Sequence, residues 1–206
     1  MSIEIKRSTK PMDYKESIRI LEERLDDIIN KKSKELIWLL EHPHVYTAGT
    51  SYKETDLLDK SINLIKTNRG GKITYHGPGQ IICYFVINLN NRKKDIRKLI
   101  SILENTIIQT LREYKIKSFN DQKNIGIWIK KNNKIKKVAA IGVRVKKWIA
   151  YHGFSINVDN DLDCYIKIKP CGLQNNKITN LKRVKDQNYK DIKNKIIKNL
   201  INNLKI

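Results

Sequence analysis

The chain is poor in the residues that cross-link or interrupt a polypeptide. Its 206 residues include only three cysteines, four prolines and nine glycines. The cysteines, Cys83, Cys164 and Cys171, form no CxxC pair, and an odd number of them does not suggest a disulfide framework. Free cysteines are typical of a reducing compartment, so we expect a cytoplasmic protein.

Targeting and membrane signals are also missing. Residues 1–7 lack the long apolar core of a signal peptide, so secretion is not indicated. No stretch approaches the roughly 18 consecutive apolar residues of a membrane-spanning helix. We therefore expect a folded protein that is not embedded in a membrane.

Cofactor signatures are equally scarce. The sequence contains neither a GxxxxGKS/T phosphate loop nor a GxGxxG motif after a strand, although ligases can bind ATP without either motif. His42 and His44 lie close together, but no third ligand follows at a suitable spacing. The pattern predicts no metal site and no bound cofactor.

Acidic residues are absent from residues 122–158, a stretch rich in lysine, and the net charge of the whole chain is +21. A basic field of this kind attracts acidic partners and weakens with salt. The sequence has no paired Cys/His zinc spacing, no RNA-recognition aromatic motif and no clear helix-turn-helix. An acidic protein partner, a nucleic acid and a merely solvated surface all remain open on charge alone.

Apolar periodicity predicts one α+β domain over residues 1–206. We expect a mixed, largely antiparallel sheet with helices against one face, and a small C-terminal extension. Helices are expected near residues 14–28, with Asp13 as the cap, 96–111 and 192–204. Strands are expected near residues 3–5, 35–40, 64, 73–89, 125–130, 136–146 and 148–158, with a turn at Asn132 and Asn133.

One segment, residues 69–80, concentrates the chain's glycine. It holds four of the nine glycines, together with Arg69, His76 and Gln80, whose side chains can orient polar groups. Clustered glycine indicates positive φ angles or a close approach between backbone and ligand. A tight hairpin is the simpler interpretation of any single glycine pair, but the whole cluster favours a binding loop.

Cys171 is the cysteine with turn-forming residues on both sides, since proline precedes it and glycine follows it. A nucleophilic cysteine needs a group that converts it to the thiolate. His76, His152 and Lys137 are the candidates, and the residues alone do not choose among them. Cys83 and Cys164 both fit the ordinary role of a small buried apolar residue.

The ordered motifs resemble those of a known family. Residues 69–80 (RGGKITYHGPGQ), 137–144 (KVAAIGVR), 152–158 (HGFSINV) and 169–173 (KPCGL) resemble the signature of octanoyl-acyl carrier protein:protein octanoyltransferases, or lipoate-protein ligase B. Residues 41–49 (EHPHVYTAG) are similar to an upstream motif of that family. The resemblance runs from about residue 35 to about residue 181.

The resemblance implies the fold of biotin and lipoate protein ligases, a central mixed sheet flanked by helices. It implies that Cys171 is the nucleophile that carries the acyl group as a thioester, and that Lys137 lowers its pKa and acts as acid and base. Neither a metal nor ATP is implied. The implied substrate contacts are Arg69, Gly70, Gly71, Lys72, Ile73, Thr74, Tyr75, His76, Ala140, Ile141, Gly142, Gly153, Phe154 and Ser155.

The resemblance also implies the partners. Octanoyl-acyl carrier protein would be the donor, and lipoyl domains of 2-oxoacid dehydrogenase complexes and the glycine cleavage H protein would be the acceptors. The enzyme would act as a monomer, with no nucleic acid and no membrane involved. The rival hypotheses are an ATP-dependent lipoate or biotin ligase on the same fold, a basic nucleic-acid-binding module, and an inactive scaffold for carrier proteins.

Overall fold

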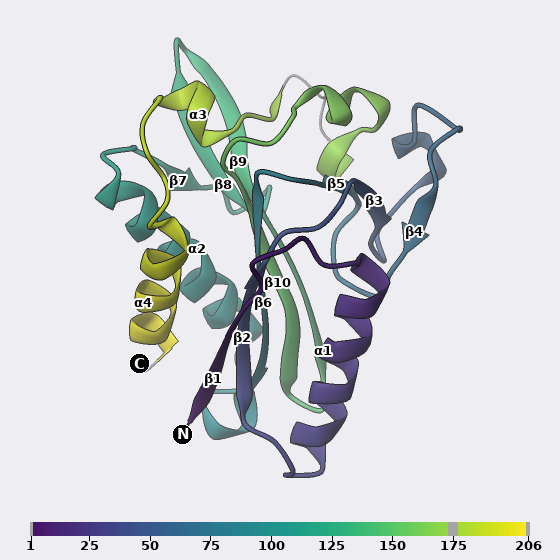
Figure 1. Cartoon of the computed structure of the whole chain (residues 1–206), viewed down its shortest axis with the longest axis vertical. Helices are drawn as coiled ribbons and strands as arrows, with labels where there is room; N and C mark the ends of the chain where they lie inside the picture. The colour runs from purple at the N-terminus through teal and green to yellow at the C-terminus, as the bar shows by residue number, and fades with distance from the viewer. Residues whose placement is uncertain (1, 173–176, 205–206) are drawn as a thin grey trace.

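The computed structural model describes residues 2–172 and 177–204, apart from the side chain of Cys171. Within these residues, seven strands form a central sheet in the order β1-β2-β6-β10-β9-β8-β7. Three shorter strands form a second sheet in the order β4-β3-β5 (Figure 1). The α+β class expected from the sequence is confirmed.

The central sheet is mixed but largely antiparallel, as predicted. β1 runs parallel to β2, and the other neighbours pair antiparallel. Asn132 and Asn133 form the predicted turn between β8 and β9, with φ angles of 49° and 56°. The strands are β1 (Ile3–Arg7), β2 (Glu35–Leu40), β6 (Gln80–Asn88), β7 (Phe119–Asn120), β8 (Ile127–Lys131), β9 (Lys134–Lys146) and β10 (Ile149–Asn157).

The second sheet consists of β3 (Val45–Ala48), β4 (Leu64–Lys66) and β5 (Ile73–His76). β3 lies between a parallel partner, β4, and an antiparallel partner, β5. The sequence patterns suggested one strand region over residues 73–89 interrupted by a loop. In the structure its two halves belong to different sheets, and this separation leaves room for a pocket between them.

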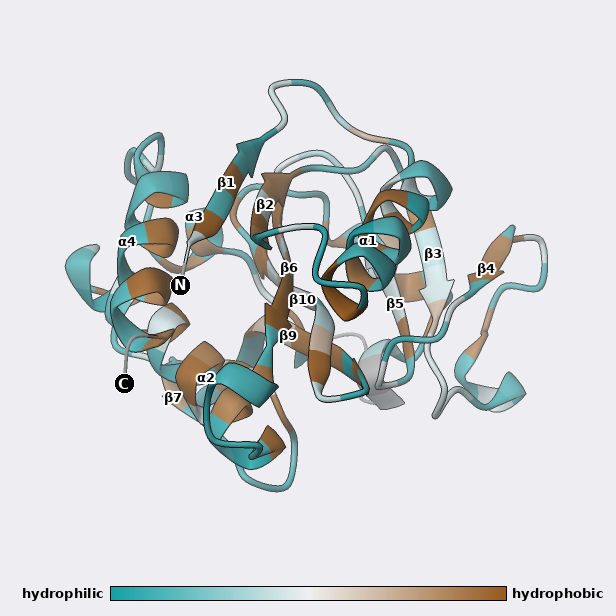
Figure 2. Ribbon diagram, turned by 90° about the horizontal axis from the view of Figure 1, so that it is seen from below, coloured by the Kyte–Doolittle hydropathy of each residue, from teal (hydrophilic) through white to brown (hydrophobic). Residues whose placement is uncertain are grey.

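Helices cover both faces of the central sheet, so the expectation of helices against one face is wrong (Figure 1). α1 (Tyr14–Ile29) packs on one face, and α2 (Ile96–Glu113) and α4 (Ile192–Leu204) pack on the other. β2 and β6 are apolar along nearly their whole length, because both faces of these strands are buried (Figure 2).

The chain's last helix is part of this core. α4 packs against α2, and its residues Ile196 and Leu200 are fully buried. The expected C-terminal extension is therefore absent from the described residues. A short helix, α3 (Leu181–Val184), precedes α4, and 3-10 turns occur at Glu54–Asp56, Leu89–Asn91, Asp163–Lys167 and Pro170–Gly172.

Helix starts follow the sequence signals. The Asp13 carboxylate accepts a hydrogen bond from the backbone N–H of Glu16 at 2.9 Å, which confirms it as the cap of α1. Asp95 caps α2 in the same way, through the N–H of Lys98 at 2.9 Å. Among the described residues, no helix combines the length and the apolar composition that crossing a bilayer requires.

A buried ion pair closes one end of the central sheet. Arg92 donates to both carboxylate oxygens of Glu35, with Nη2 2.8 Å from Oε2. The backbone N–H of Asn88 donates to the same carboxylate at 2.8 Å. The two side chains are only 13% and 7% exposed, so each depends on the other for its polar contacts.

We expect Arg92→Ala to lower the free energy of unfolding by about 3–5 kcal/mol, because it leaves the Glu35 carboxylate buried without its cation. Urea unfolding followed by circular dichroism measures this change. Arg19→Ala is the matched control: Arg19 is exposed and pairs with Glu16 and Glu23 on the surface of α1. Equal effects of the two substitutions would contradict a stabilising role for the buried Arg92–Glu35 pair.

Candidate functional site

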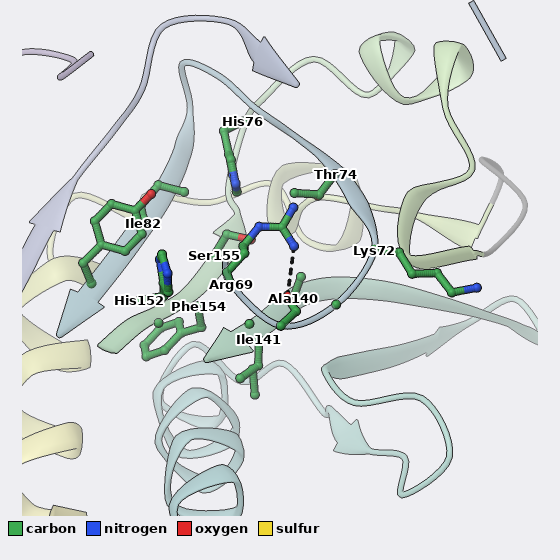
Figure 3. Close-up of a pocket in the computed structure, with 15 residues that line it drawn as sticks. Arg69, Lys72, Thr74, His76, Ile82, Ala140, Ile141, His152, Phe154 and Ser155 are labelled. Atoms are coloured by element: carbon green, nitrogen blue, oxygen red, sulfur yellow. Dashed lines mark hydrogen bonds between the residues drawn. The ribbon is translucent and has the colours of Figure 1, made fainter. Parts of the chain in front are cut away.

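A pocket lies between the glycine-rich segment 69–76 and the central strands β6, β10 and β9 (Figure 3). It encloses about 500 Å³ of empty space, partly open to solvent. Its lining residues are Arg69, Gly70, Gly71, Lys72, Thr74, His76, Ile82, Tyr84, Ala140, Ile141, Gly142, His152, Gly153, Phe154 and Ser155.

The structure brings the motifs expected to bind substrate into this one pocket, with two exceptions. Because side chains alternate along β5, Thr74 and His76 face the pocket, whereas Ile73 and Tyr75 pack into the core beneath the second sheet. Ile73 and Tyr75 therefore support the pocket wall without lining the cavity.

Three lining residues were not among the expected substrate contacts. Ile82 and Tyr84 lie on β6, opposite Ser155 and Gly153 of β10. Their place in the pocket follows from this pairing, which a local sequence pattern does not reveal. His152 was a candidate base, and its position beside Gly153 was the signal that could have identified it as a lining residue.

Arg69 ties the second sheet to the pocket. Its Nη2 donates to the backbone oxygen of Thr47 on β3 at 2.9 Å and to the hydroxyl of Thr47 at 2.8 Å. Its Nη1 donates to the oxygen of Gly70 at 3.1 Å. The next N–H, that of Gly70, donates to Val143 on β9 at 3.2 Å. The segment therefore bridges the two sheets above the pocket.

Two paired glycines give the pocket its depth. Gly142 of β9 and Gly153 of β10 are direct neighbours in the sheet. A Cβ atom on Gly153 would lie 1.8 Å from the backbone oxygen of Cys83, and one on Gly142 would lie 3.0 Å from the oxygen of Gly70. No other residue fits at Gly153 without moving the backbone, so the floor of the pocket requires glycine there.

His76 presents an uncharged ring to the pocket (Figure 3). Its Nδ1 lies 2.6 Å from Oε1 of Gln80, whose Nε2 donates to Oδ1 of Asn157 at 2.8 Å and to the hydroxyl of Tyr165 at 3.0 Å. The network orients the Gln80 oxygen toward His76, which assigns the proton to Nδ1 and leaves Nε2 as an acceptor. Burial, with the positive charge of Arg69 nearby, lowers the pKa of His76 to about 3.

His152 is also neutral and lies in an unusual conformation. It is 1% exposed, and its φ angle is +71°. Its Nε2 lies 2.6 Å from Oδ1 of Asn68. Burial and the nearby charges of Arg69 and Arg144 lower the pKa of His152 to about 3. A ring of this kind can accept a hydrogen bond, but it is a weak base at neutral pH.

Lys137 is buried in β9, outside the lining of the pocket. Its Nζ donates to the backbone oxygen of Ile125 at 2.9 Å and lies 4.9 Å from the centre of the Trp128 ring. Its own backbone oxygen accepts a hydrogen bond from Thr179 at 2.9 Å. The chain that follows the Cys171 turn is therefore anchored to Lys137 by the backbone.

The backbone of Cys171 lies in the 3-10 turn Pro170–Gly172, against β5. The φ angle of Gly172 is +73°, consistent with the unusual turn expected there. A Cβ atom on Gly172 would lie 2.3 Å from Nζ of Lys72, so the Lys72 side chain rests on this turn. The position of the Cys171 sulfur relative to Lys137 lies outside the described part of the structure.

The two cysteines whose side chains are described differ in environment. Cys83 is fully buried in β6, and burial raises the pKa of its thiol. This confirms its role as a core residue. Cys164 is partly exposed, with Sγ 3.6 Å from Oδ2 of Asp161, so the expectation of full burial does not hold for it.

His42 and His44 take separate hydrogen-bond partners. Nδ1 of His42 lies 2.7 Å from the backbone oxygen of Met12, and its Nε2 lies 2.9 Å from the hydroxyl of Tyr84. Nδ1 of His44 lies 2.6 Å from the hydroxyl of Tyr75. No cluster of three or more potential metal ligands occurs among the residues that the structure describes.

Known proteins resemble this chain in sequence and in fold. The family model of the lipoyl protein ligase A/B catalytic domain matches residues 13–201. The octanoyltransferase of Ehrlichia chaffeensis is 46% identical over 184 residues, which cover 88% of this chain and 86% of the relative. That of Bartonella bacilliformis is 44% identical over 189 residues, covering 87% and 78%.

A bipartite lipoate protein ligase from Thermoplasma acidophilum shares the fold. Its structure superposes with a TM-score of 0.74 over 100% of this chain and 85% of that chain, at 15% sequence identity. At this identity the likeness concerns the fold only, and it confirms the ligase-like fold expected from the motifs.

We predict that acid destabilises the protein through its buried histidines. His76 and His152 have pKa values of about 3, and burial also lowers that of His42, whereas an unfolded histidine titrates near about 6.5. Between these values the unfolded chain binds more protons than the native one, so the free energy of unfolding falls as the pH decreases from about 7 to about 5. Urea unfolding across this range measures the effect.

Proton NMR of the imidazole rings provides the direct check. The ring resonances of His76 and His152 should not titrate in the native protein between about pH 8 and about pH 5, and should titrate in the urea-unfolded protein. Native resonances that titrate near pH 6.5 would refute the neutral assignment. The variants His76→Gln and His152→Asn identify the two sets of signals.

Proposed function

The chain belongs to the lipoyl protein ligase A/B catalytic-domain family and transfers octanoyl groups in protein lipoylation; we propose that it works through a thioester on Cys171. The donor is octanoyl-acyl carrier protein. The acceptor is a lysine of a lipoyl domain, such as those of 2-oxoacid dehydrogenase complexes or the glycine cleavage H protein. Cys171 is the nucleophile, and Lys137 is its acid–base partner.

One observation carries the proposal: the pocket extends from Lys72, which rests on the Cys171 turn, to apolar groups on the central strands. Ile82, Ile141 and Phe154 contribute hydrocarbon surface to its lining. Hydrocarbon lining suits an acyl chain, because moving the methylene groups of the chain from water into the pocket is favourable. A pocket next to a candidate nucleophile fits a thioester intermediate better than a nucleic-acid surface.

In the first half-reaction the Cys171 thiolate attacks the carbonyl carbon of the octanoyl thioester. The bond between that carbon and the sulfur of the carrier breaks, a new carbon–sulfur bond to Cys171 forms, and the departing thiolate of the carrier takes up a proton. One thioester replaces another of similar energy. The exchange therefore needs no ATP.

In the second half-reaction the amine of the acceptor lysine attacks the Cys171 thioester. An amide bond forms, the carbon–sulfur bond breaks, and the proton lost by the amine passes through Lys137 to the Cys171 thiolate. Lys137 is suited to this role because it is buried and a backbone oxygen holds its Nζ at 2.9 Å. His76 and His152, whose pKa values are about 3, are too weakly basic to compete.

Charge on the surface suits acidic partners. Lys130, Lys131 and Lys134 are exposed along the β8–β9 hairpin, Lys136 is half-buried there, and the net charge of the chain is +21. Complementary charge raises the rate of encounter and helps orient the partners. This field would serve both an acidic carrier protein and an acidic lipoyl domain.

We expect an octanoyl adduct on Cys171 after the protein is mixed with octanoyl-acyl carrier protein. Intact-mass spectrometry detects the adduct, hydroxylamine should release it as expected for a thioester, and peptide mapping should place it on Cys171. Cys164→Ala is the matched control and should keep the adduct. Acylation of Cys164 or Cys83 instead, or ATP-dependent activity that survives Cys171→Ala, would overturn the assignment and favour an ATP-dependent ligase.

We expect Lys137→Ala to raise the pKa of Cys171 and to slow octanoyl transfer by about 10²–10⁴-fold, the usual range for an acid–base group. Lys137→Arg should restore thiolate formation but not transfer, because guanidinium does not release its proton. Alkylation of Cys171 across a pH series and single-turnover transfer rates measure the two effects. Lys136→Ala is the matched control on the same strand. Wild-type transfer by Lys137→Arg would leave Lys137 as an electrostatic partner only.

A further inference from the structure

Two polar atoms in the wall of the pocket have no hydrogen-bond partner among the residues that the structure describes. They are Nε of Arg69 and Nδ1 of His152, and both are buried. Both residues line the same pocket. Nearly all buried polar atoms in proteins are paired, so two orphaned atoms at one cavity require an explanation.

The two atoms form a donor and an acceptor. Nδ2 of Asn68 donates to Glu22 at 3.0 Å, which turns Oδ1 of Asn68 toward Nε2 of His152 at 2.6 Å. Nε2 therefore carries the proton of the neutral ring, and Nδ1 has a free lone pair. Nε of Arg69 always carries a hydrogen. A single small group that both accepts and donates would satisfy the pair.

The backbone holds His152 in place for this role. Successive side chains of a strand normally point to opposite faces, yet the imidazole stacks on the ring of its neighbour Tyr151, with centroids 4.6 Å apart. The φ angle of +71° produces this arrangement. A left-handed φ is uncommon for a residue other than glycine, and such strain is concentrated at functional sites.

The pair lies away from the proposed nucleophile. Figure 3 shows Lys72 and His152 on opposite sides of Arg69. Lys72 rests on the turn that contains Cys171, so His152 lies on the side of the pocket away from that turn. An acyl chain attached at Cys171 would point its methyl end toward His152.

We propose that Arg69 and His152 form a polar end wall that selects the acyl chain by its length. Nε–H of Arg69 donates to one water molecule, and that water donates to Nδ1 of His152 at the end of the bound chain. A longer chain would displace the water with a methyl group that satisfies neither atom. This inference rests on the proposed function, since it takes the pocket to hold the acyl group.

The end wall predicts a preference that apolar packing alone would not produce. Nonanoyl and 8-hydroxyoctanoyl groups both extend octanoyl by one heavy atom, a carbon in one and an oxygen in the other. A terminal hydroxyl can replace the water and pair with both protein atoms, whereas a methyl group leaves both unpaired. Sites built to hydrogen-bond a hydroxyl discriminate strongly against its absence.

The experiment measures kcat/KM for transfer from acyl carrier protein loaded with octanoyl, nonanoyl or 8-hydroxyoctanoyl. In the wild-type protein the ratio of 8-hydroxyoctanoyl to nonanoyl should be at least about tenfold higher than in His152→Gly. Glycine adopts the φ angle of residue 152 without strain, so the substitution removes the ring and spares the backbone. Equal ratios in the two proteins would overturn the proposal.

Two further variants complete the test. His152→Asn, which also tolerates a positive φ, should shift the ratio in the same direction and replaces the glycine variant if that one does not fold. Lys136→Ala, which lies outside the pocket lining, is the control and should leave the ratio unaltered. A wild-type protein that transfers no octanoyl group would refute the proposed function, whereas octanoyl transfer with nonanoyl strongly preferred over 8-hydroxyoctanoyl would refute the end wall alone.

Discussion

The pocket depends on the contact between Arg69 and Thr47. The two hydrogen bonds from Nη2 to Thr47 hold the segment before β5 to β3, and the backbone N–H groups of Gly49, Thr50 and Ser51 donate to the same segment. The same segment reaches the central sheet through the N–H of Gly70 and Val143. Arg69 and the adjacent N–H of Gly70 thus link the small sheet to the large one, and the pocket lies between them. Arginine suits this task because its planar group donates in several directions at once.

Burial determines the protonation state of the two histidines in the pocket. His76 and His152 have pKa values of about 3, so they can accept hydrogen bonds without attracting a counter-ion. An apolar acyl chain next to two imidazolium ions would be unfavourable, because isolated charges are costly to desolvate. The positive charge of Arg69 also lowers the pKa of both rings. Under the proposed function, the pocket binds the acyl chain and Lys137, outside its lining, transfers the proton.

Local patterns in the sequence predicted the elements better than their arrangement. Helical spacing located α1, α2 and α4, and Asp13 marked the start of α1. The motifs predicted most of the pocket lining, because each is a short continuous segment. The positions of Ile82 and Tyr84 in the pocket, and the burial of both faces of the sheet, depend on which elements lie next to each other. That pairing joins residues far apart in the chain, where periodicity carries no information.

The missing side chains of Gly142 and Gly153 explain why such short motifs identify the site. These glycines are adjacent across β9 and β10, and a side chain on Gly153 would collide with the backbone of β6. A Cβ atom on Gly142 would lie 3.0 Å from the backbone oxygen of Gly70, which also lines the pocket. The pocket thus depends on the absence of side chains at Gly142 and Gly153. Arg69 and His152 lie in its wall. Glycine next to polar residues is the sequence signature that this geometry requires.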